Sequence, residues 1–354
     1  MTKINQHIEI AHTANMNINT MGPKSCRMIQ SALSSVYKKV GISRVNNTNE
    51  LISLVSKKPD LVFLGLKRLP QVDGFGDIGV EDSWIADYLD KVGINYTGSK
   101  RKAHELGVYK HDAKLCVHNA GLPTAKFFKA LPGKYKNESE LPLEFPLFVK
   151  PNSSGGSKGI DDNSVVRNFA EFKKKVEYIY DRFGTSSLVE QYLTGREFSV
   201  AVLAELSGGL RAMPIEIIAD QNSKGDRILS CGIKKADTER VVAINGTDVF
   251  QQVSQLALAV FTALGARDFG RVDIRMDESG QPYFLEANLI PGLRGGYFTR
   301  ACRLNAGMEY NEMIQHIAKL ALSRSSSAET FMVDMQFINS ESIIDSVELE
   351  TNPY

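Results

Sequence analysis

Four polar side chains alternate with apolar ones in the segment GRVDIRMDESGQPYFLEANLIPG, residues 270–292. Successive side chains of a β-strand point to opposite faces, so Arg271 and Asp273 share one face. Glu286 and Asn288 share a face of the next strand for the same reason. The pattern predicts a β-hairpin with a polar cluster on one side.

A turn closed by Asp277 opposite Pro282 predicts the register of this hairpin. In that register Asp273 lies opposite Glu286, with Cβ atoms ~5 Å apart, and the arginine lies opposite the asparagine. Two carboxylates this close repel each other unless a cation lies between them, and Mg²⁺ prefers such oxygen ligands. A surface ladder of salt bridges from Arg271 to the two carboxylates explains the same pattern about equally well.

A second segment, LFVKPNSSGGSKG at residues 147–159, has the character of a phosphate-binding loop. It predicts a strand that delivers Lys150 to a loop rich in Gly and Ser. Backbone N–H groups of such a loop can surround phosphate oxygens, and the lysine adds a point charge. The GxxxxGK[ST] pattern is absent, and a solvent loop with an exposed lysine is the simpler interpretation of this segment taken alone.

The remaining elements suggest how these two segments are held. In the first hundred residues, strand patterns alternate with helix patterns, which favours an open, mostly parallel sheet. The strands are expected at residues 8–12 and 60–66, and the helices at 26–40, 50–57 and 81–92. A glycine-rich loop is expected at 73–79, and a single linking helix at 102–118.

The later part of the chain reads as an α+β region. A helix with apolar residues at 166, 169, 172, 176, 179 and 183 is expected to end at Gly184. Strands are expected at 145–150, 198–206 and 210–218, and the hairpin at 269–288. One helix is expected to be capped by Asp248 with Gln251, and a last helix is expected near 307–322. The fold class is therefore α/β and α+β. Domains are expected at 1–101, 102–219 and 220–325, with a tail at 326–354 that is disordered or adds a strand at 331–338.

Composition excludes several classes of function. The 354 residues exceed what one core usually organises. The net charge of +1 gives no sign of a nucleic-acid surface, and no apolar run reaches the ~20 residues of a membrane span. The four cysteines lie far apart without a CxxC pair, which fits a cytoplasmic protein.

Taken together, the ordered motifs resemble those of the D-alanine–D-alanine ligases, a branch of the ATP-grasp superfamily. The resemblance covers roughly residues 60–322 and includes GVEDSWIADYLDKVGINYTGS (79–99), FVKPNSSGGSKGI (148–160) and LVEQYLTGREFSVAVL (188–203). It implies an ATP-grasp fold with an N-terminal open α/β domain and an ATP-dependent ligase that works through an acyl phosphate. It also implies two Mg²⁺ ions that Mn²⁺ can replace, a homodimer, and small amino-acid-like substrates.

The resemblance also assigns roles to single residues. The nucleotide would be contacted by Lys110, Lys150, Ser157, Glu190, Gln191, Tyr192, Leu193, Glu197, Lys234 or Lys235, and Leu285. The metal ligands would be Asp273, Glu286 and Asn288. The catalytic residues would be Arg271, Gly292 and Lys150.

Departures from the family pattern concentrate where the amino-acid substrates would bind. The first β–α turn, AHTANMNINTMGPKS, lacks the family's glutamate, and Leu64-Gly65-Leu66 replaces a Leu-His-Gly. Gly156-Ser157 replaces a serine pair, and LRGGY at 293–297 replaces small hydroxyl residues. Arg294 and Tyr297 are therefore expected to contact substrate, and Arg294 could anchor a carboxylate.

Three functions remain open from the sequence. The first is a ligase for two small molecules with substrates other than D-alanine. The second is a nucleotide-binding homologue that has lost catalysis, which the complete set of Arg271, Asp273, Glu286 and Asn288 disfavours. The third is a ligase acting on a peptide terminus, for which the glycine-rich 292–297 region leaves room.

Overall fold

The structure is a computed structural model that describes residues 2–15, 21–69, 83–244 and 248–324. Its first part is a parallel sheet of three strands in the order β2-β1-β3, and this confirms the predicted open parallel sheet. The elements are β1 (Ile4–His12), α1 (Pro23–Ser34), β2 (Tyr37–Arg44), α2 (Thr48–Ser56) and β3 (Leu61–Leu64). The glycine-rich loop expected at 73–79 lies outside the described residues.

The helix expected at 26–40 is wrong in its second half. Helix α1 ends at Ser34, and Tyr37–Arg44 forms strand β2 beside β1. Tyr37 is buried, while Val40 and Ile42 pack partly buried against the same core. These apolar residues complete the sheet, and that tertiary contact outweighs the local helix pattern.

The single linking helix expected at 102–118 is also wrong. Two helices, α4 (Arg101–Leu106) and α5 (Lys110–Asn119), occupy this region. They follow the antiparallel pair of β4 (Arg68–Leu69) and β5 (Ser83–Trp84) and helix α3 (Ile85–Lys91). The break between α4 and α5 places the start of α5 next to Asn152. The Asn152 carbonyl accepts a hydrogen bond from the Lys110 N–H at 3.1 Å. The Asn152 side chain accepts from the His111 N–H at 2.9 Å. The break therefore couples α5 to the predicted phosphate-binding loop.

A second sheet holds that loop. Its order is β6-β9-β7-β8, and α6 packs on it. The bounds are β6 (Phe127–Ala130), the short 3₁₀ helix η1 (Glu138–Glu140), β7 (Leu147–Pro151), β8 (Val165–Val166), α6 (Phe169–Phe183) and β9 (Ser187–Gln191). Gly184 ends α6 with φ 60°, which confirms the predicted left-handed C-terminal glycine. Val166 belongs to β8, whereas the sequence pattern had placed it in the helix.

The third sheet carries the hairpin. It is antiparallel in the order β12-β11-β10-β13-β14. Its elements and their neighbours are β10 (Glu197–Ala204), β11 (Leu210–Ile218), α7 (Cys231–Ala236), β12 (Arg240–Ala243), α8 (Asp248–Ala263), β13 (Phe269–Met276), β14 (Pro282–Asn288) and α9 (Tyr297–Ala306). Asp248 is the first described residue of α8 and is itself helical, so it is not the residue before the helix. The sheet contains strands from both sides of the domain boundary expected at residue 219.

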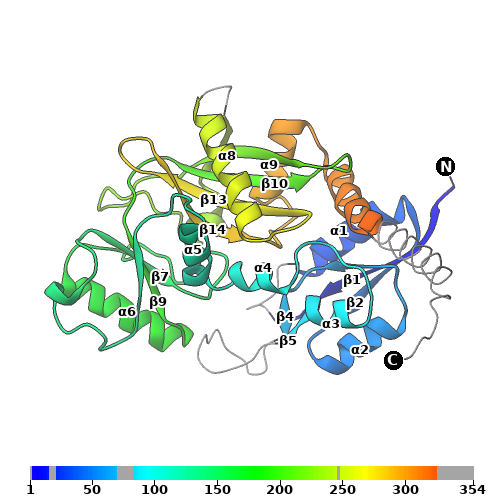
Figure 1. The fold of residues 1–354 in the computed structure, drawn as a ribbon, viewed down its shortest axis with the longest axis horizontal. Helices are drawn as coiled ribbons and strands as arrows, with labels where there is room; N and C mark the ends of the chain where they lie inside the picture. The colour runs from blue at the N-terminus through cyan, green and yellow to red at the C-terminus, as the bar shows by residue number, and fades with distance from the viewer. Residues whose placement is uncertain (1, 16–20, 70–82, 245–247, 325–354) are drawn as a thin grey trace, which may run out of the picture.

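Two helices cover opposite faces of this sheet (Figure 1). Helix α8 packs on the face that buries Phe198, Val200 and Ile274. Helix α9, which the sequence had not predicted, packs on the face of Ala201 and Leu203. Because neighbouring residues of β10 face opposite sides, this one strand contributes to both cores. No described helix is both long and apolar enough to cross a membrane.

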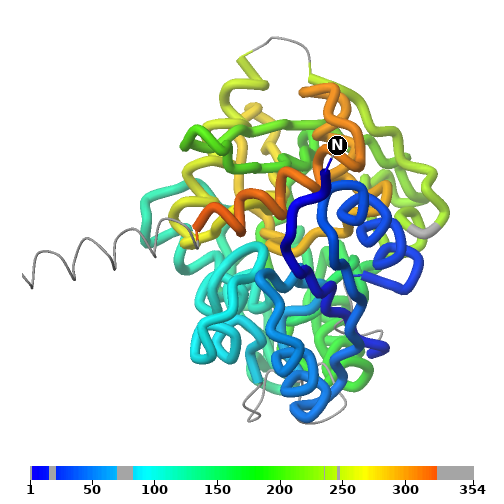
Figure 2. The backbone as a smooth tube through the Cα atoms, turned by 90° about the vertical axis from the view of Figure 1, so that its right-hand side faces the viewer, coloured from blue at the N-terminus to red at the C-terminus, as the bar shows by residue number. Residues whose placement is uncertain are grey.

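The largest core joins the two ends of the described chain. A helix runs from Tyr310 to Arg324, close to the expected 307–322, and its Met313, Ile314 and Ile317 are fully buried. They belong to one cluster with Ile8 and the other core residues of the N-terminal sheet. Figure 2 shows this helix, in orange and red, beside the blue N-terminal strand.

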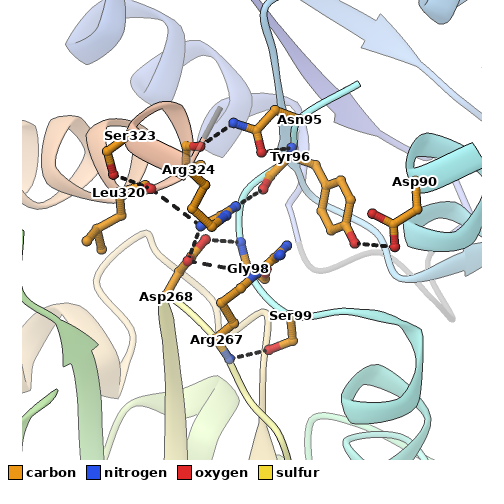
Figure 3. A network of polar contacts seen from close by, with 11 residues as sticks. Asp90, Asn95, Tyr96, Gly98, Ser99, Arg267, Asp268, Leu320, Ser323 and Arg324 are labelled. Carbon is orange, nitrogen blue, oxygen red and sulfur yellow. Dashed lines mark hydrogen bonds and ion pairs between the residues drawn. The ribbon is translucent and has the colours of Figure 1, made fainter. Parts of the chain in front are cut away.

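A polar network ties the same regions together (Figure 3). The buried carboxylate of Asp268 accepts from the Gly98 N–H at 2.7 Å and pairs with Arg324. Arg324 also donates to the Tyr96 carbonyl at 2.6 Å, and the Arg267 Nε donates to the Gly98 carbonyl at 2.7 Å. The segment that leaves the N-terminal sheet is thereby fixed to the start of β13 and to the helix at 310–324.

Candidate functional site

The hairpin of β13 and β14 holds the polar cluster that the sequence predicted. Arg271 lies opposite Asn288, and Asp273 lies opposite Glu286. Both predicted pairings are confirmed.

The predicted turn closure is wrong by one residue. Met276, not Asp277, lies opposite Pro282, because a β-bulge leaves Leu285 as an extra residue of β14. In a regular strand Leu285 and Glu286 would point to opposite faces, but here both line the same pocket. The bulge thus places an apolar side chain beside a carboxylate.

Asp273 is the best-connected member of the cluster. Both its oxygens accept from Arg271, at 2.9 Å each. The Ser199 hydroxyl of β10 donates to it at 2.6 Å, and the Asn288 amide lies at 3.4 Å. Burial alone would lower the pKa of Arg271, but Asp273 and Glu286 outweigh burial and raise that pKa. Asp273 is thus positioned by residues of three strands.

A chain of lysines and glutamates adjoins the hairpin. Glu190 of β9 is buried, and its two oxygens pair with Lys114 and Lys150, at 2.6 Å each. Burial would raise the pKa of Glu190, but these two lysines lower it below its usual value. Lys110 lies 3.7 Å from Glu286. Helix α5 and strand β7 therefore bring three ammonium groups to one edge of the hairpin.

Glu286 stays ionised in this setting. Burial would raise its pKa, but Lys110, Lys150, Lys234 and Arg271 lower it to about 2. For Lys110 burial is the larger effect, so its pKa is lowered despite the neighbouring carboxylate. The site is a concentration of partly compensated charge, which is common at functional sites.

A small pocket of about 70 Å³ opens at the bulge. Tyr192 stacks on Phe148 with ring centroids 6.3 Å apart, and the Arg275 guanidinium lies 5.5 Å from the Tyr192 ring. Glu197 pairs with Arg275 at 3.3 Å, but burial still raises the pKa of Glu197. Predicted nucleotide contacts line this pocket, namely Lys150, Ser157, Glu190, Gln191, Tyr192, Leu193, Glu197, Lys234 and Leu285.

A larger cavity of about 530 Å³ adjoins the small pocket, since Lys234 and Glu286 line both. It extends between the N-terminal region, the start of α5, the 153–158 loop and the start of α9. The predicted residues that line it are Lys110, Lys234, Arg271, Glu286, Asn288, Gly292, Arg294 and Tyr297.

The structure thus brings together every site residue predicted from the sequence whose side chain is described. Arg294 is exposed at the edge of the larger cavity, whereas Tyr297 is buried. The side chain of Lys235, the alternative to Lys234, lies outside the described residues.

Several residues of the site were missed by sequence reasoning. Arg275 follows Arg271 and Asp273 on the same strand face, so alternation could have identified it. Lys67 reaches the larger cavity from the β3–β4 connection and Arg68 from the start of β4. Glu239 reaches it from the residue before β12. No local pattern marks these three, because only the packing of separate sheets brings them to the cavity.

The residues at the hairpin fit a hard divalent cation. Asp273, Glu286 and Asn288 offer carboxylate and amide oxygens, the ligands that Mg²⁺ prefers. The Asn288 amide nitrogen faces Asp273, and rotation of the amide by half a turn would present its oxygen instead. The carboxylates are opposed by the strand register, so one ion could contact both.

Comparison with known proteins agrees with this geometry. The family model described as "D-ala D-ala ligase C-terminus" matches residues 116–319. The D-alanine–D-alanine ligase of Alcanivorax borkumensis is 30% identical over 252 residues, which cover 70% of this chain and 75% of that protein.

Solved structures share the fold at low sequence identity. The D-alanine–D-alanine ligase of Bacillus anthracis, solved in complex with ATP, superposes with a TM-score of 0.68 and 19% identity, covering 91% of this chain and 99% of that one. The VanG D-Ala:D-Ser ligase of Enterococcus faecalis gives a TM-score of 0.63 and 19% identity, covering 90% and 100%. The described architecture is therefore the ATP-grasp fold. Because the family model spans more than half of the sequence, the chain belongs to the D-alanine–D-alanine ligase family of ATP-dependent ligases.

Proposed function

We propose that the protein is an ATP- and Mg²⁺-dependent ligase that joins the carboxylate of one small molecule to the amine of another. The observation that carries this proposal is the junction of the two cavities at Lys234 and Glu286. A nucleotide with its base in the small pocket would direct its phosphates past these residues into the larger cavity. The reaction would then take place beside Arg271 and Asp273.

The small pocket supports the position of the nucleotide. Leu193 and Leu285 offer apolar contact to a base, and the backbone at 191–193 is within reach of its edge. Glu197 can accept hydrogen bonds from ribose hydroxyls. Lys150 also lines this pocket, where it can pair with phosphate oxygens as a point charge.

The larger cavity supports the chemistry. In the first step a substrate carboxylate attacks the γ-phosphorus of ATP, which gives an acyl phosphate and ADP. An amine then attacks the acyl carbon, and phosphate leaves. Arg271 and the Gly292 N–H would stabilise negative charge on the reacting carboxyl group, while Lys110 and Lys150 hold the phosphates.

Asp273, Glu286 and Asn288 would hold Mg²⁺, which neutralises phosphate charge when bound. We expect two ions, with Mn²⁺ able to replace Mg²⁺, and a homodimer in solution.

The substrates form a separate part of the proposal. We infer that D-alanine is not preferred at both amino-acid positions. The side chains at the cavity support this inference: Tyr297 is a large residue whose hydroxyl binds Glu239, and Arg294 stands at the cavity edge. A pocket built around particular polar groups discriminates strongly, because a wrong ligand leaves those groups unpaired.

Phosphate release from ATP tests the activity. We expect release that depends on Mg²⁺ and on a pair of substrates, from a panel of D- and L-amino acids and short peptides. ATP binding by calorimetry without any substrate release would instead support a nucleotide-binding homologue. If D-alanine alone gives the highest kcat/KM, the inference on substrates is wrong while the ligase proposal stands.

A further inference from the structure

Glu239 is a buried carboxylate in the wall of the larger cavity, and the proposed reaction gives it no role. It precedes strand β12 and is 7% exposed. Its Oε1 accepts a hydrogen bond from the Tyr297 hydroxyl. Its Oε2 is fully buried and has no hydrogen-bond partner among the described residues.

None of the described cations that line the same cavity forms an ion pair with Glu239. Arg271 is engaged by both oxygens of Asp273, and Arg300 pairs with Asp237 at 2.6 Å. Lys234 lies over the Tyr297 ring, 5.7 Å from its centroid, close to the junction with the small pocket. In the part of the chain that the structure describes, Glu239 thus has one carboxylate oxygen without a partner.

A buried polar atom without a partner is costly, and a buried charge more so. The carboxyl group can rotate about its last C–C bond and turn an oxygen toward the cavity. An ammonium group there would bind that oxygen, whereas a carboxylate would be repelled. The Arg271 guanidinium lies 5.4 Å from the Tyr297 ring, so the Glu239–Tyr297 pair adjoins the hairpin cluster where the acyl phosphate would form.

We propose that Glu239, held by Tyr297, forms the subsite that receives the acceptor amine as its ammonium ion. This inference rests on the proposed ligase function. The ammonium donates a hydrogen bond to Oε2 and transfers one proton to it, which frees the nitrogen lone pair. That lone pair attacks the acyl carbon, the C–N bond forms, and the C–O bond to phosphate breaks. The second nitrogen proton leaves with phosphate, and Glu239 returns its proton to solvent.

Hydroxylamine separates the two halves of the reaction. It is uncharged at neutral pH and captures acyl phosphates as hydroxamates, so it needs neither an ammonium subsite nor a base. The donor would be the amino acid that gives the fastest hydroxamate formation in a panel of D- and L-amino acids. The acceptors would be the same amino acids.

The test variant is Glu239→Gln, which keeps an oxygen to accept from Tyr297 but removes the charge. We expect kcat/KM for ammonium acceptors to fall at least tenfold, and hydroxamate formation to stay within twofold of the wild type. The matched control is Glu216→Gln, which removes a carboxylate that Arg196 already neutralises and that lies outside both cavities. This control should leave both rates within twofold.

Two outcomes would overturn the inference. In one, Glu239→Gln keeps the acceptor kcat/KM of the wild type. In the other, Glu239→Gln loses hydroxamate formation as strongly as ligation. That result would show that Glu239 acts before the amine step or in folding. Failure of the wild type to form any hydroxamate would overturn the ligase proposal itself and this inference with it.

Discussion

Asp273 illustrates how a single side chain can depend on several neighbours at once. Its oxygens accept from Arg271 and Ser199, and Glu286 lies opposite it across the hairpin. A carboxylate has about four acceptor positions, and Arg271 and Ser199 occupy three of them. A metal ion would take the fourth, which the Asn288 amide nitrogen now faces. The arrangement holds the carboxylate in one orientation before any ligand binds.

Replacing either opposed carboxylate should abolish Mg²⁺-dependent turnover without unfolding the protein. Asp273→Asn and Glu286→Gln keep the side-chain shape but remove the charge that a hard cation needs. We expect turnover at limiting Mg²⁺ to fall by roughly a hundredfold to a thousandfold, on the order of the loss when a group acting on transition-state charge is removed. Phosphate release and circular dichroism would check this. Near-normal turnover in either variant at low Mg²⁺ would exclude that residue as a ligand.

Lys67 gives a pH dependence of known sign. Burial and the nearby charges of Lys110 and Arg68 lower its pKa to about 8, so its charge is lost as pH rises through that value. Because Lys67 lines the larger cavity, an anionic donor should bind more weakly above pH 8. We expect the donor KM in hydroxamate formation to rise severalfold between pH 7 and pH 9.

Lys67→Arg should move this rise to higher pH, because arginine keeps its charge throughout the range. Lys67→Met should raise the KM already at pH 7 and flatten its pH dependence. The exposed Lys100 offers a control, since Lys100→Met should leave the profile unchanged. A profile that is the same in all these proteins would contradict the role of Lys67.

Among the elements, strand β14 shows what one inserted residue achieves. Phe284 and Ala287 point into the core under α8, whereas Leu285, Glu286 and Asn288 are partly exposed toward the cavities. Without Leu285, the sequence would alternate between core and cavity without interruption. The bulge is therefore an addition to a hairpin that could pair regularly.

Deleting Leu285 should keep the fold and weaken nucleotide binding. The deletion leaves Phe284, Glu286 and Ala287 on their present faces. We therefore expect a melting temperature within about 5 °C of the wild type. In a protein of this size, that shift corresponds to ~1–2 kcal/mol in the free energy of unfolding. The pocket loses its apolar wall, and ATP affinity measured by calorimetry should fall at least tenfold. Leu285→Ala should give a smaller loss. Unchanged affinity in the deletion variant would show that the bulge has no part in nucleotide binding.

The elements also show where sequence reasoning reaches its limit. Alternation along each strand of the hairpin was predictable, because a strand's side-chain period is local. The pairing of Asp273 with Glu286 was predicted correctly although the turn was misplaced by one residue, because the bulge at Leu285 offsets that error. The bulge itself was not predictable, since no local pattern marks the residue that is left unpaired. Strand β2 and helix α9 were missed for a related reason: both take their structure from the core they share with residues far away in the sequence. Gly107, which separates α4 from α5, gave a local sign of the break that the helix pattern obscured.

At the scale of the whole molecule, Asp268 connects three parts of the chain. It binds the Gly98 backbone and Arg324, and its own φ of 64° lies in the left-handed region. Asp and Asn tolerate this conformation better than most residues that have a Cβ. The position therefore combines a charge requirement with a backbone requirement.

Asp268 substitutions should rank by these two requirements. Asp268→Asn keeps the backbone preference but leaves Arg324 without its counter-charge. We expect the free energy of unfolding to fall by roughly 2–3 kcal/mol. This loss is smaller than for a fully buried ion pair, because Arg324 is partly exposed. Asp268→Ala should lose about 1 kcal/mol more, from backbone strain. Urea unfolding measures both. Equal stability of the two variants would contradict the backbone contribution.

The site as a whole was predictable only in part, and the reason is spatial. Residues on one strand face or in one loop, such as Asp273 and Lys150, follow from local patterns. Lys67 and Glu239 come from separate regions that meet only at the larger cavity, so their proximity is a property of the assembled molecule.

The core shared by the N-terminal sheet and the helix at 310–324 has a consequence for the order of folding. Met313 and Ile317 complete the cluster around Ile8, and the Gln315 side chain donates to the Ala32 carbonyl at 3.0 Å. During synthesis, strand β1 leaves the ribosome long before its covering helix does. Part of the apolar surface of the first sheet therefore stays uncovered while some three hundred further residues are synthesised. Such long-range closure slows folding and favours protection of the nascent chain by a chaperone.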